Sequence, residues 1–292
     1  MNATTTHLDA LRRKRVTFIG TGVMGEAIIA ALLDGGLLEA GQITGSEPYP
    51  ERREELAGRY GIRMVASNAE ATDGADVVML TIKPQSLNAI FSDLGGQLAP
   101  EQVVVSIIAG ATVERLRHGL DHQRIVRSMP NTPAQIGQGV TVWMPTSAVS
   151  DEQNLVVSAL LSAMGHAVRV ESEDAVDMAT ALSGTGPAYI FLVMEALIDA
   201  GVHMGFPRRI AEELVLQTMI GSVLFARESG KHPAELRNMV TSPGGTTAAA
   251  LYQMEKGSLR TVISRAVWAA YQRTVELGQD NPAPVPPRER DA

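Results

Sequence analysis

The chain has 292 residues, 45% of them hydrophobic and 20% charged, an ordinary globular composition whose length favours two domains. Its net charge of −7, without a basic stripe, excludes the electrostatic footprint of a nucleic-acid-binding protein, and zero cysteines exclude disulfides and a cysteine nucleophile. No apolar run reaches the roughly 20 residues that span a bilayer, and the N-terminus lacks the apolar core of a signal peptide. We therefore expect a cytoplasmic protein with neither a nucleic-acid nor a membrane partner.

Two kinds of hydrophobic pattern divide the chain. Short β-branched runs alternate with amphipathic helical patterns up to about residue 170, which predicts βαβ units with a parallel sheet. The predicted strands are residues 16–19, 42–45, 77–82, 103–108, 125–127, 140–144 and 167–170. Apolar residues then recur at helical spacing through 175–182, 188–204, 210–226 and 259–277. The fold class is therefore α/β, with an all-helical second half.

A glycine-rich turn, Gly20-Thr-Gly-Val-Met-Gly25, follows the first predicted strand and leads into an apolar helix. Gly20 permits the tight turn, Gly22 lets backbone N–H groups approach a pyrophosphate, and Gly25 lets the helix pack closely on the strand. The start of the helix adds its partial positive charge. This context predicts a Rossmann-type domain in which a dinucleotide is bound by Gly20, Thr21, Gly22, Val23, Met24 and Gly25.

The end of the second predicted strand carries Glu47. A carboxylate at this position can accept the ribose hydroxyls of NAD and would repel the 2′-phosphate of NADP. Arg52 and Arg53 follow closely and could offset that phosphate, although solvated charges opening a helix explain them equally well. The sequence leaves the choice between NADH and NADPH open.

Three further loops follow predicted strands, and ligands of open α/β sheets bind at the carboxyl ends of strands. Lys83 and Pro84 follow the third long strand, where the lysine either meets the cofactor or ends a strand in solvent. Ala109 and Gly110 follow the next. Asn131 lies in a stiff proline-flanked loop, where its amide either contacts the ligand or supports a turn. We include all five residues in the predicted cofactor site.

The domain boundary is predicted near residues 171–174, where an acidic cluster with Ser172 can cap an incoming helix. We expect a flexible N-terminus over residues 1–14, a dinucleotide-binding domain over 15–172, and a helical domain over 173–280. The proline-rich residues 281–292 are predicted to form a disordered tail.

Two glycine-rich segments, residues 183–189 and 241–247, interrupt the helical half and both lead into helices. Pro187 suits a first helical turn, and Thr246 and Thr247 are predicted N-caps of a helix beginning at Ala248. Bare N–H groups at that helix start, with Ser242 and the threonine hydroxyls, would form a pocket for a small carboxylate. Capping and packing alone explain the residues equally well.

Here the chain resembles a known family. Residues 236–255, with Ser242-Pro-Gly-Gly-Thr-Thr247, closely resemble the signature segment of pyrroline-5-carboxylate reductases. Further blocks are similar and in the same order, namely residues 20–25, 82–84, 106–110, 127–133 and 183–189. The resemblance covers residues 16 to 277. The departures are Thr185 where serine is usual, the proline-rich tail, and Glu47 where many members carry a residue friendlier to NADP.

The resemblance implies reduction of the cyclic imine pyrroline-5-carboxylate to L-proline by NADPH or NADH, the last step of proline biosynthesis. It implies that Thr247 meets the ring nitrogen, that Ser242 and the backbone of Gly244, Gly245, Thr246 and Thr247 hold the substrate carboxylate, and that Asn68 contacts the adenosine side. Ser242 and Thr247 are the predicted catalytic residues. The family also implies a homodimer through the helical domain and allows a larger ring, a decamer.

The chemistry limits what these residues can do. No His, Glu or Lys lies within 242–247, so Thr247 is predicted to orient the imine or relay a proton through water rather than act as a free-standing acid. The six histidines lack metal-ligand spacing, so no metal site is predicted.

Two other classes of protein share parts of this pattern. Another two-domain dehydrogenase should place a catalytic lysine on a helix, whereas Lys231 and Lys256 occupy loop-like positions beside glycine. A non-catalytic NAD(P)H sensor would not require the intact 242–247 turn.

Overall fold

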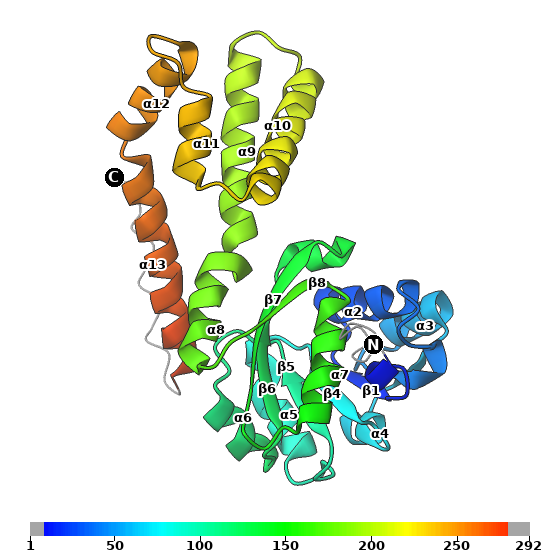
Figure 1. The fold of residues 1–292 in the computed structure, drawn as a ribbon. Coiled ribbons are helices and arrows are strands. Elements are labelled where there is room, and N and C mark those ends of the chain that lie inside the picture. Colours follow the sequence, from blue (N-terminus) through cyan, green and yellow to red (C-terminus); the bar gives the residue numbers. More distant parts are fainter. Residues whose placement is uncertain (1–8, 280–292) are drawn as a thin grey trace, which may run out of the picture. The chain divides into compact units, whose positions relative to one another are not determined.

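The computed structural model describes residues 9–279, and these form two compact units (Figure 1). Among the described residues, unit 1 comprises 9–185 with 270–279, and unit 2 comprises Gly186–Ala269. The tail predicted to be disordered, residues 281–292, lies outside the described residues, as do residues 1–8.

Unit 1 is built on a sheet that, within the described residues, has eight strands in the order β3-β2-β1-β4-β5-β6-β7-β8. The strands are β1 (Val16–Ile19), β2 (Ile43–Ser46), β3 (Arg63–Val65), β4 (Val77–Leu80), β5 (Val103–Ser106), β6 (Ile125–Met129), β7 (Gly139–Pro145) and β8 (Gly165–Arg169). The predicted α/β fold is confirmed. β4 and β5 end two residues earlier than predicted, so Thr81 and Ile107 already belong to the loops of the carboxyl edge.

One strand pair departs from the parallel sheet that the sequence predicts: β6 and β7 are antiparallel, while every other described neighbour pair is parallel. Between them lies the short helix η3 (Thr132–Ile136). A parallel connection takes a dozen or more residues, so this link only allows the chain to turn back. The longer link through α7 (Asp151–Ser162) restores the parallel direction at β8.

Helices cover both faces of the sheet, as Figure 1 shows. On one face, α2 (Val23–Asp34) and α7 pack against alternate strand residues such as Val16 and Phe18. On the other, α4 (Asn68–Thr72), α5 (Leu87–Leu94) and α6 (Val113–Leu120) pack against Ile19, Val78 and Val104. Because strand side chains alternate between faces and both faces are covered, the strands read as continuous apolar runs. The remaining helix of this region, α3 (Pro50–Tyr60), follows β2.

The segment entering β1 is packed rather than free. Leu11 is fully buried in the core that contains α2 and α7, and Lys14 donates its backbone N–H to the Leu11 carbonyl at 2.9 Å. The flexible N-terminus predicted for residues 1–14 therefore does not include this part of the segment.

The second half is helical, as predicted. Ser172 caps α8 (Glu173–Ala179) by accepting the Ala175 N–H at 3.3 Å, and a π-helical turn, η4 (Thr180–Gly184), joins α8 to α9. The helices that follow are α9 (Gly186–His203), α10 (Arg208–Ser229), α11 (Pro233–Met239), α12 (Thr246–Lys256) and α13 (Leu259–Gly278). Pro187 lies in the first turn of α9, as expected, and Lys256 ends α12 rather than lying in a loop.

The predicted N-caps of α12 are wrong. The N-cap is Gly245, and Thr246 and Thr247 are already helical. Gly244 turns the chain at φ +70°, and the Gly245 N–H donates to the Ser242 carbonyl at 3.1 Å, so the chain enters the helix one residue before the threonines. A threonine inside the first turn lacks the extended backbone that a capping side chain needs.

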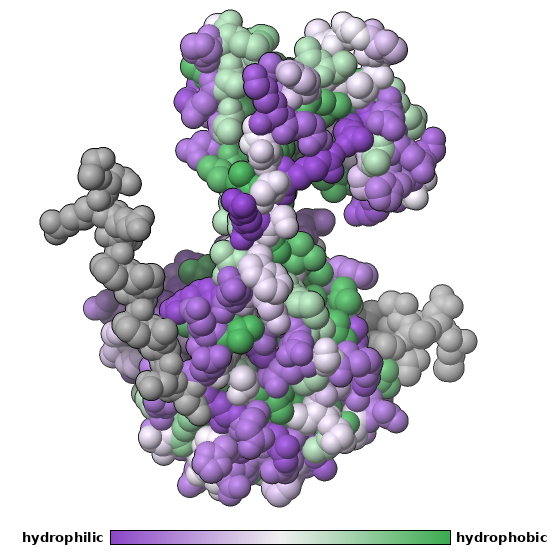
Figure 2. All heavy atoms as spheres, turned by 90° about the vertical axis from the view of Figure 1, so that its left-hand side faces the viewer, coloured by the Kyte–Doolittle hydropathy of each residue, from purple (hydrophilic) through white to green (hydrophobic). Residues whose placement is uncertain are grey.

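The helices of unit 2 leave many large apolar side chains exposed, part of which Figure 2 shows in green. The exposed residues on α9 and α10 include Ile190, Phe191, Leu192, Leu197, Leu214, Ile220, Val223 and Phe225. Many exposed apolar side chains on two neighbouring helices are typical of an interaction site. By length and composition alone, the helical stretch Glu173–His203 could also span a membrane, a pattern that our sequence expectation overlooked.

Candidate active site

The turn between β1 and α2 is shaped by two glycines that no other residue could replace without displacement. Gly20 has φ +84°, and a Cβ added there would lie 2.6 Å from the Ile82 Cγ2. A Cβ on Gly25 would lie 2.7 Å from the Gly20 carbonyl oxygen and 3.1 Å from the Thr81 Oγ1. The turn is therefore packed tightly against the start of the loop after β4.

Gly22 differs because a Cβ added there would meet no atom of residues 9–279 within 4 Å. It is the N-cap of α2, it supplies no side-chain cap, and its carbonyl accepts the Glu26 N–H at 2.9 Å. The N–H groups of Val23, Met24 and Gly25 therefore point out of the helix start. Open space in front of outward-pointing donors fits a pyrophosphate.

Glu47 lies directly after β2 and faces this turn. Its Oε2 accepts the Thr21 backbone N–H at 3.3 Å and the Thr21 hydroxyl at 3.1 Å, and the side chain is only 8% exposed. The carboxylate is therefore held against the second residue of the glycine-rich turn.

Arg52, on α3, is engaged beneath the turn. Its guanidinium donates to Glu55 at 2.7 Å and to the Thr21 carbonyl at 3.2 Å, and it forms an ion pair with Glu26 of α2. Arg53 points elsewhere, because its Nη1 donates to the backbone carbonyls of Glu47 at 2.7 Å and of Pro48 at 2.8 Å.

Glu26 is the centre of the ionic cluster below the turn. Burial acts to raise the pKa of its carboxyl, but hydrogen bonds from Arg52 and Tyr60 and the charges of Arg52 and Arg59 outweigh burial and lower the pKa. The Tyr60 hydroxyl donates to Glu26 at 2.9 Å. The cluster joins α2 to α3 and supports the turn from behind.

Asn68, the first residue of α4, lies beside the end of β2. Its Oδ1 accepts the Ser46 hydroxyl at 2.6 Å, and its amide donates to Asp93 at 2.8 Å. The residue predicted to contact the adenosine side is thus adjacent to Glu47 along the carboxyl edge.

The loops after β4 and β5 place the next predicted residues on the same edge. Lys83 and Pro84 open the short helix η2 (Pro84–Ser86), and Lys83 is exposed. Ala109 is half-buried, whereas Gly110 is buried at φ +73° and packs so closely on the last turn of α13 that a Cβ would lie 2.6 Å from the Leu277 Cβ.

The Asn131 amide is engaged at both ends. Its Oδ1 accepts the Val140 N–H at 2.9 Å, and its Nδ2 donates to the Ser183 carbonyl at 3.1 Å. Asn131 therefore ties the loop after β6 to β7 and to the π-helical turn. This is the supporting role that the sequence left open beside a ligand contact.

In unit 2, residues 242–247 form the turn before α12. A Cβ on Gly245 would lie 2.5 Å from the Ser242 Oγ, so this serine hydroxyl lies directly against the backbone of the turn. Ala249 is the donor to the N-cap carbonyl of Gly245, at 3.2 Å, which leaves the N–H groups of Thr246, Thr247 and Ala248 pointing outward. Ser242 is exposed and Thr247 is half-buried. The helix start thus presents outward-pointing N–H donors beside the Ser242 hydroxyl.

Sequence reasoning missed a buried ionic cluster on β6. Arg127 is 2% exposed and pairs with Asp177 and, at 2.8 Å, with Glu173, both on α8. Glu173 also accepts the Val113 N–H at the start of α6, at 2.6 Å. An arginine inside an apolar strand, with an acidic helix later in the chain, is the signal that could have suggested it.

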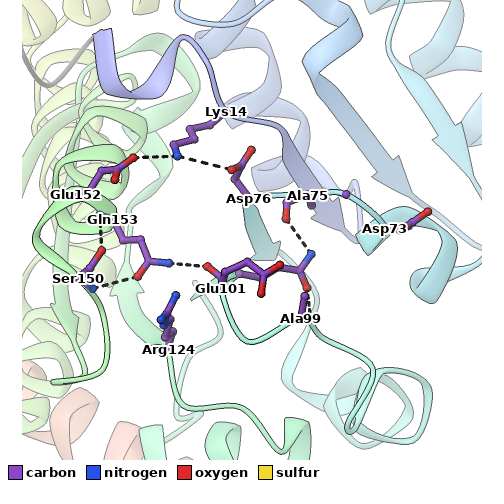
Figure 3. A pocket seen from close by; sticks show the side chains of 12 residues that line it. Lys14, Asp73, Ala75, Asp76, Ala99, Glu101, Arg124, Ser150, Glu152 and Gln153 are labelled. Atoms are coloured by element: carbon purple, nitrogen blue, oxygen red, sulfur yellow. Dashed lines mark hydrogen bonds and ion pairs between the residues drawn. The ribbon is translucent and has the colours of Figure 1, made fainter.

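A hollow of about 560 Å³ lies at the opposite edge of the sheet (Figure 3). Lys14, Asp76 and Gln102 stand just before β1, β4 and β5, so this hollow is at the amino ends of the strands. Lys14 pairs there with Glu152 at 3.0 Å and Asp76 at 3.7 Å. None of the residues that the sequence predicts for the site lines it.

By fold and by the geometry of its glycine-rich turn, the protein is of the dinucleotide-binding class, with a separate helical region. Residues 173–277 match the family of pyrroline-5-carboxylate reductase dimerisation domains, and residues 15–110 match that of coenzyme F420-dependent NADP oxidoreductases. A pyrroline-5-carboxylate reductase of Pseudomonas aeruginosa is 43% identical over 266 residues, which cover 91% of this chain and 97% of the relative. The chain belongs to the pyrroline-5-carboxylate reductase family.

Solved structures agree. The pyrroline-5-carboxylate reductase of Coxiella burnetii has a TM-score of 0.84 at 34% identity, covering 91% of this chain and 99% of that one. The pyrroline carboxylate reductase of Plasmodium falciparum, solved with NADP bound, has a TM-score of 0.84 at 28% identity and covers 92% and 100%.

Proposed function

We propose that the protein is a cytoplasmic pyrroline-5-carboxylate reductase that uses NADPH or NADH to form L-proline, the last step of proline biosynthesis. The observation that carries this proposal is that one chain holds two outward-facing helix starts, at Gly22 and at Gly245, each with the donors for an anionic ligand. The first suits a dinucleotide pyrophosphate and the second a small carboxylate. Relatives of that name match nearly their whole length.

The dinucleotide supplies the hydride. Gly20, Gly22 and the first N–H groups of α2 would hold its pyrophosphate, with Thr21, Val23, Met24 and Gly25 forming the rest of the turn. Glu47 and Asn68 would face the adenosine ribose, and Lys83, Pro84, Ala109, Gly110 and Asn131 would line the carboxyl edge beyond it. Their shared position at the ends of neighbouring strands supports this assignment.

The substrate would be held by the turn before α12. Ser242 and the backbone of Gly244, Gly245, Thr246 and Thr247 would bind its carboxylate, and the Thr247 hydroxyl would orient the ring nitrogen. Reduction adds a hydride to the imine carbon while the nitrogen carries a proton. The two ligands have to be oriented so that the imine carbon lies roughly 3–3.5 Å from the nicotinamide carbon. In such a site this orientation accounts for most of the rate acceleration.

We further propose a homodimer formed through unit 2, and a decameric ring as a larger assembly. The exposed apolar residues of α9 and α10 support the dimer. Removing apolar surface from water is favourable by about 25 cal/mol per Å² of that surface. A second copy packed on these helices would also explain why the helical stretch 173–203 is so apolar, so that no membrane span is needed to explain it. Light scattering should give a dimer or a multiple of it, and Phe191→Glu should shift the mass toward the monomer.

The activity is tested by following nicotinamide absorbance with pyrroline-5-carboxylate and either dinucleotide. The expected result is loss of the reduced nicotinamide only when protein and imine are both present, with proline as the product. Binding of dinucleotide without turnover would instead identify a sensor, and turnover of a 2-hydroxyacid in preference to the imine would identify a different dehydrogenase.

A further inference from the structure

The carboxylate at the end of β2 has one oxygen fixed and one oxygen open. Glu47 Oε2 accepts two hydrogen bonds from Thr21, whereas residues 9–279 provide no hydrogen bond to Oε1. The side chain is 8% exposed, so water screens its charge poorly. The open oxygen can accept ribose hydroxyls, and the same charge opposes a phosphate on the 2′ position.

The two arginines that the sequence offered as a counter-charge are already engaged. Arg52 is balanced by Glu26 and Glu55 and donates to the Thr21 carbonyl, so its guanidinium is part of the support behind the turn. Moving it toward a 2′-phosphate would break two ion pairs and leave the half-buried Glu26 without this partner. Such a rearrangement opposes binding rather than assisting it.

Arg53 carries a charge that no described carboxylate pairs with, but its Nη1 donates to two backbone carbonyls, of Glu47 and of Pro48. These contacts hold the guanidinium against the loop that presents Glu47. Turning Arg53 outward toward a phosphate would break both hydrogen bonds, whereas the carboxylate of Glu47 is held by Thr21.

We infer that Glu47, locked to the glycine-rich turn, makes this chain discriminate against the 2′-phosphate, so that NADH is its better cofactor. The inference rests on the proposed dinucleotide site and specifies its ligand. It would set this protein apart from the Plasmodium relative that was solved with NADP bound.

The test isolates the 2′-phosphate from the chemistry. The intact protein is titrated calorimetrically with ADP-ribose and with 2′-phospho-ADP-ribose, two probes that differ by that one group. We expect the phosphorylated probe to bind at least tenfold more weakly. Glu47→Gln keeps an acceptor for Thr21 and removes the charge, and it should reduce the difference to threefold or less.

Two control variants change a charge on α3, the helix that follows the segment carrying Glu47. Glu51 is exposed in the first turn of α3, and Glu51→Gln should leave the ratio of the two affinities unchanged. Arg53→Gln should change it by less than twofold, because Arg53 does not reach the phosphate. The ratio of kcat/KM values for NADH and NADPH in the assembled enzyme should follow the binding ratio.

The outcomes separate this inference from the proposed function. Equal binding of the two probes, or tighter binding of the phosphorylated one, overturns the inference while leaving a dinucleotide site in place. A preference that survives Glu47→Gln overturns the role of Glu47, and a selective loss of the phosphorylated probe in Arg53→Gln does the same. If neither probe binds, the dinucleotide site and with it the proposed function fail. Should Glu47→Gln not fold, the wild-type ratio and the Arg53→Gln result still decide.

Discussion

The two glycine-rich turns use glycine for different reasons. In the turn of unit 1, Gly20 and Gly25 have no room for a Cβ, because atoms of neighbouring residues in the same unit occupy that position. In the turn of unit 2, Gly244 needs its positive φ, but a Cβ there would meet no described atom within 4 Å. Gly245, the next residue, is packed only within its own turn, because a Cβ there would lie 2.5 Å from the Ser242 Oγ. The first turn is therefore held against the loop after β4, whereas the second is held by contacts within itself. Each turn also has one glycine, Gly22 or Gly244, with open space in place of a Cβ.

The strongest way to break this comparison is to fill the open space of the first turn. Gly22→Val places a side chain where the pyrophosphate would lie, and we expect dinucleotide affinity to fall on the order of 100-fold, about 2.7 kcal/mol. Thermal unfolding should change little, because a Cβ at this position meets no atom of the described chain. Calorimetric titration with NADH checks the affinity, and a normal isotherm would remove the turn from the cofactor site.

The tight packing of the first turn gives the next largest effect. Gly25→Ala would put a methyl 2.7 Å from the Gly20 carbonyl oxygen, and overpacking of this kind costs about 2 kcal/mol of unfolding free energy. Gly58→Ala is the matched control in α3, since a Cβ there has no neighbour within 4 Å among the described residues. It should stabilise the protein by about 1 kcal/mol through helix propensity. Denaturant melts that rank the two variants in the other order would contradict the comparison.

A smaller effect is expected at the second turn. Thr247→Ala should lower kcat by about tenfold, or about 1.4 kcal/mol, through lost orientation of the imine. The dinucleotide dissociation constant should stay within a factor of two, because this residue belongs to the substrate turn. Thr247→Ser restores the hydroxyl and should recover most of the rate. Unchanged turnover in the alanine variant would exclude Thr247 from the mechanism.

The smallest expected effect is on the free energy of unfolding at low pH. The pKa of Glu26 is lowered in the folded protein, so its contribution to stability is present above the unfolded value of about 4.3 and is lost as the pH falls through the folded pKa. Glu26→Gln should flatten that part of the stability-versus-pH curve by roughly 1 kcal/mol or less, since the pairs are partly exposed. Urea melts between pH 3 and pH 7 measure it, and parallel curves for both proteins would rule out the role.

Local pattern predicted every described strand except the three-residue β3, and both turns, because each of these depends on residues close in sequence. The β1–turn–α2 segment is an example, in which glycine spacing and an apolar helix suffice. The reversal at β7 was not predicted, because an apolar run carries no sign of its direction, although the short link before it limits the choice.

Side-chain pairing was beyond sequence reasoning. Arg127 meets Glu173 and Asp177, which lie 46 and 50 positions away, and such pairs follow from the fold alone. The sequence left the role of Arg52 and Arg53 open for the same reason, namely that their partners are set by the fold. Only the packing of α2 against α3 shows that Glu26 engages Arg52, while the β2–α3 loop engages Arg53.

The contact between Gly110 and Leu277 has a consequence for how the protein is made. These residues are far apart in the chain, yet the backbone of one lies directly against the other, and Thr274 is buried nearby in the same unit. When residues up to 185 have been synthesised, unit 1 is therefore still incomplete, because residues 270–279 have yet to be translated. The surface of the nascent dinucleotide-binding region around Gly110 therefore stays uncovered until residues 270–279 have been synthesised.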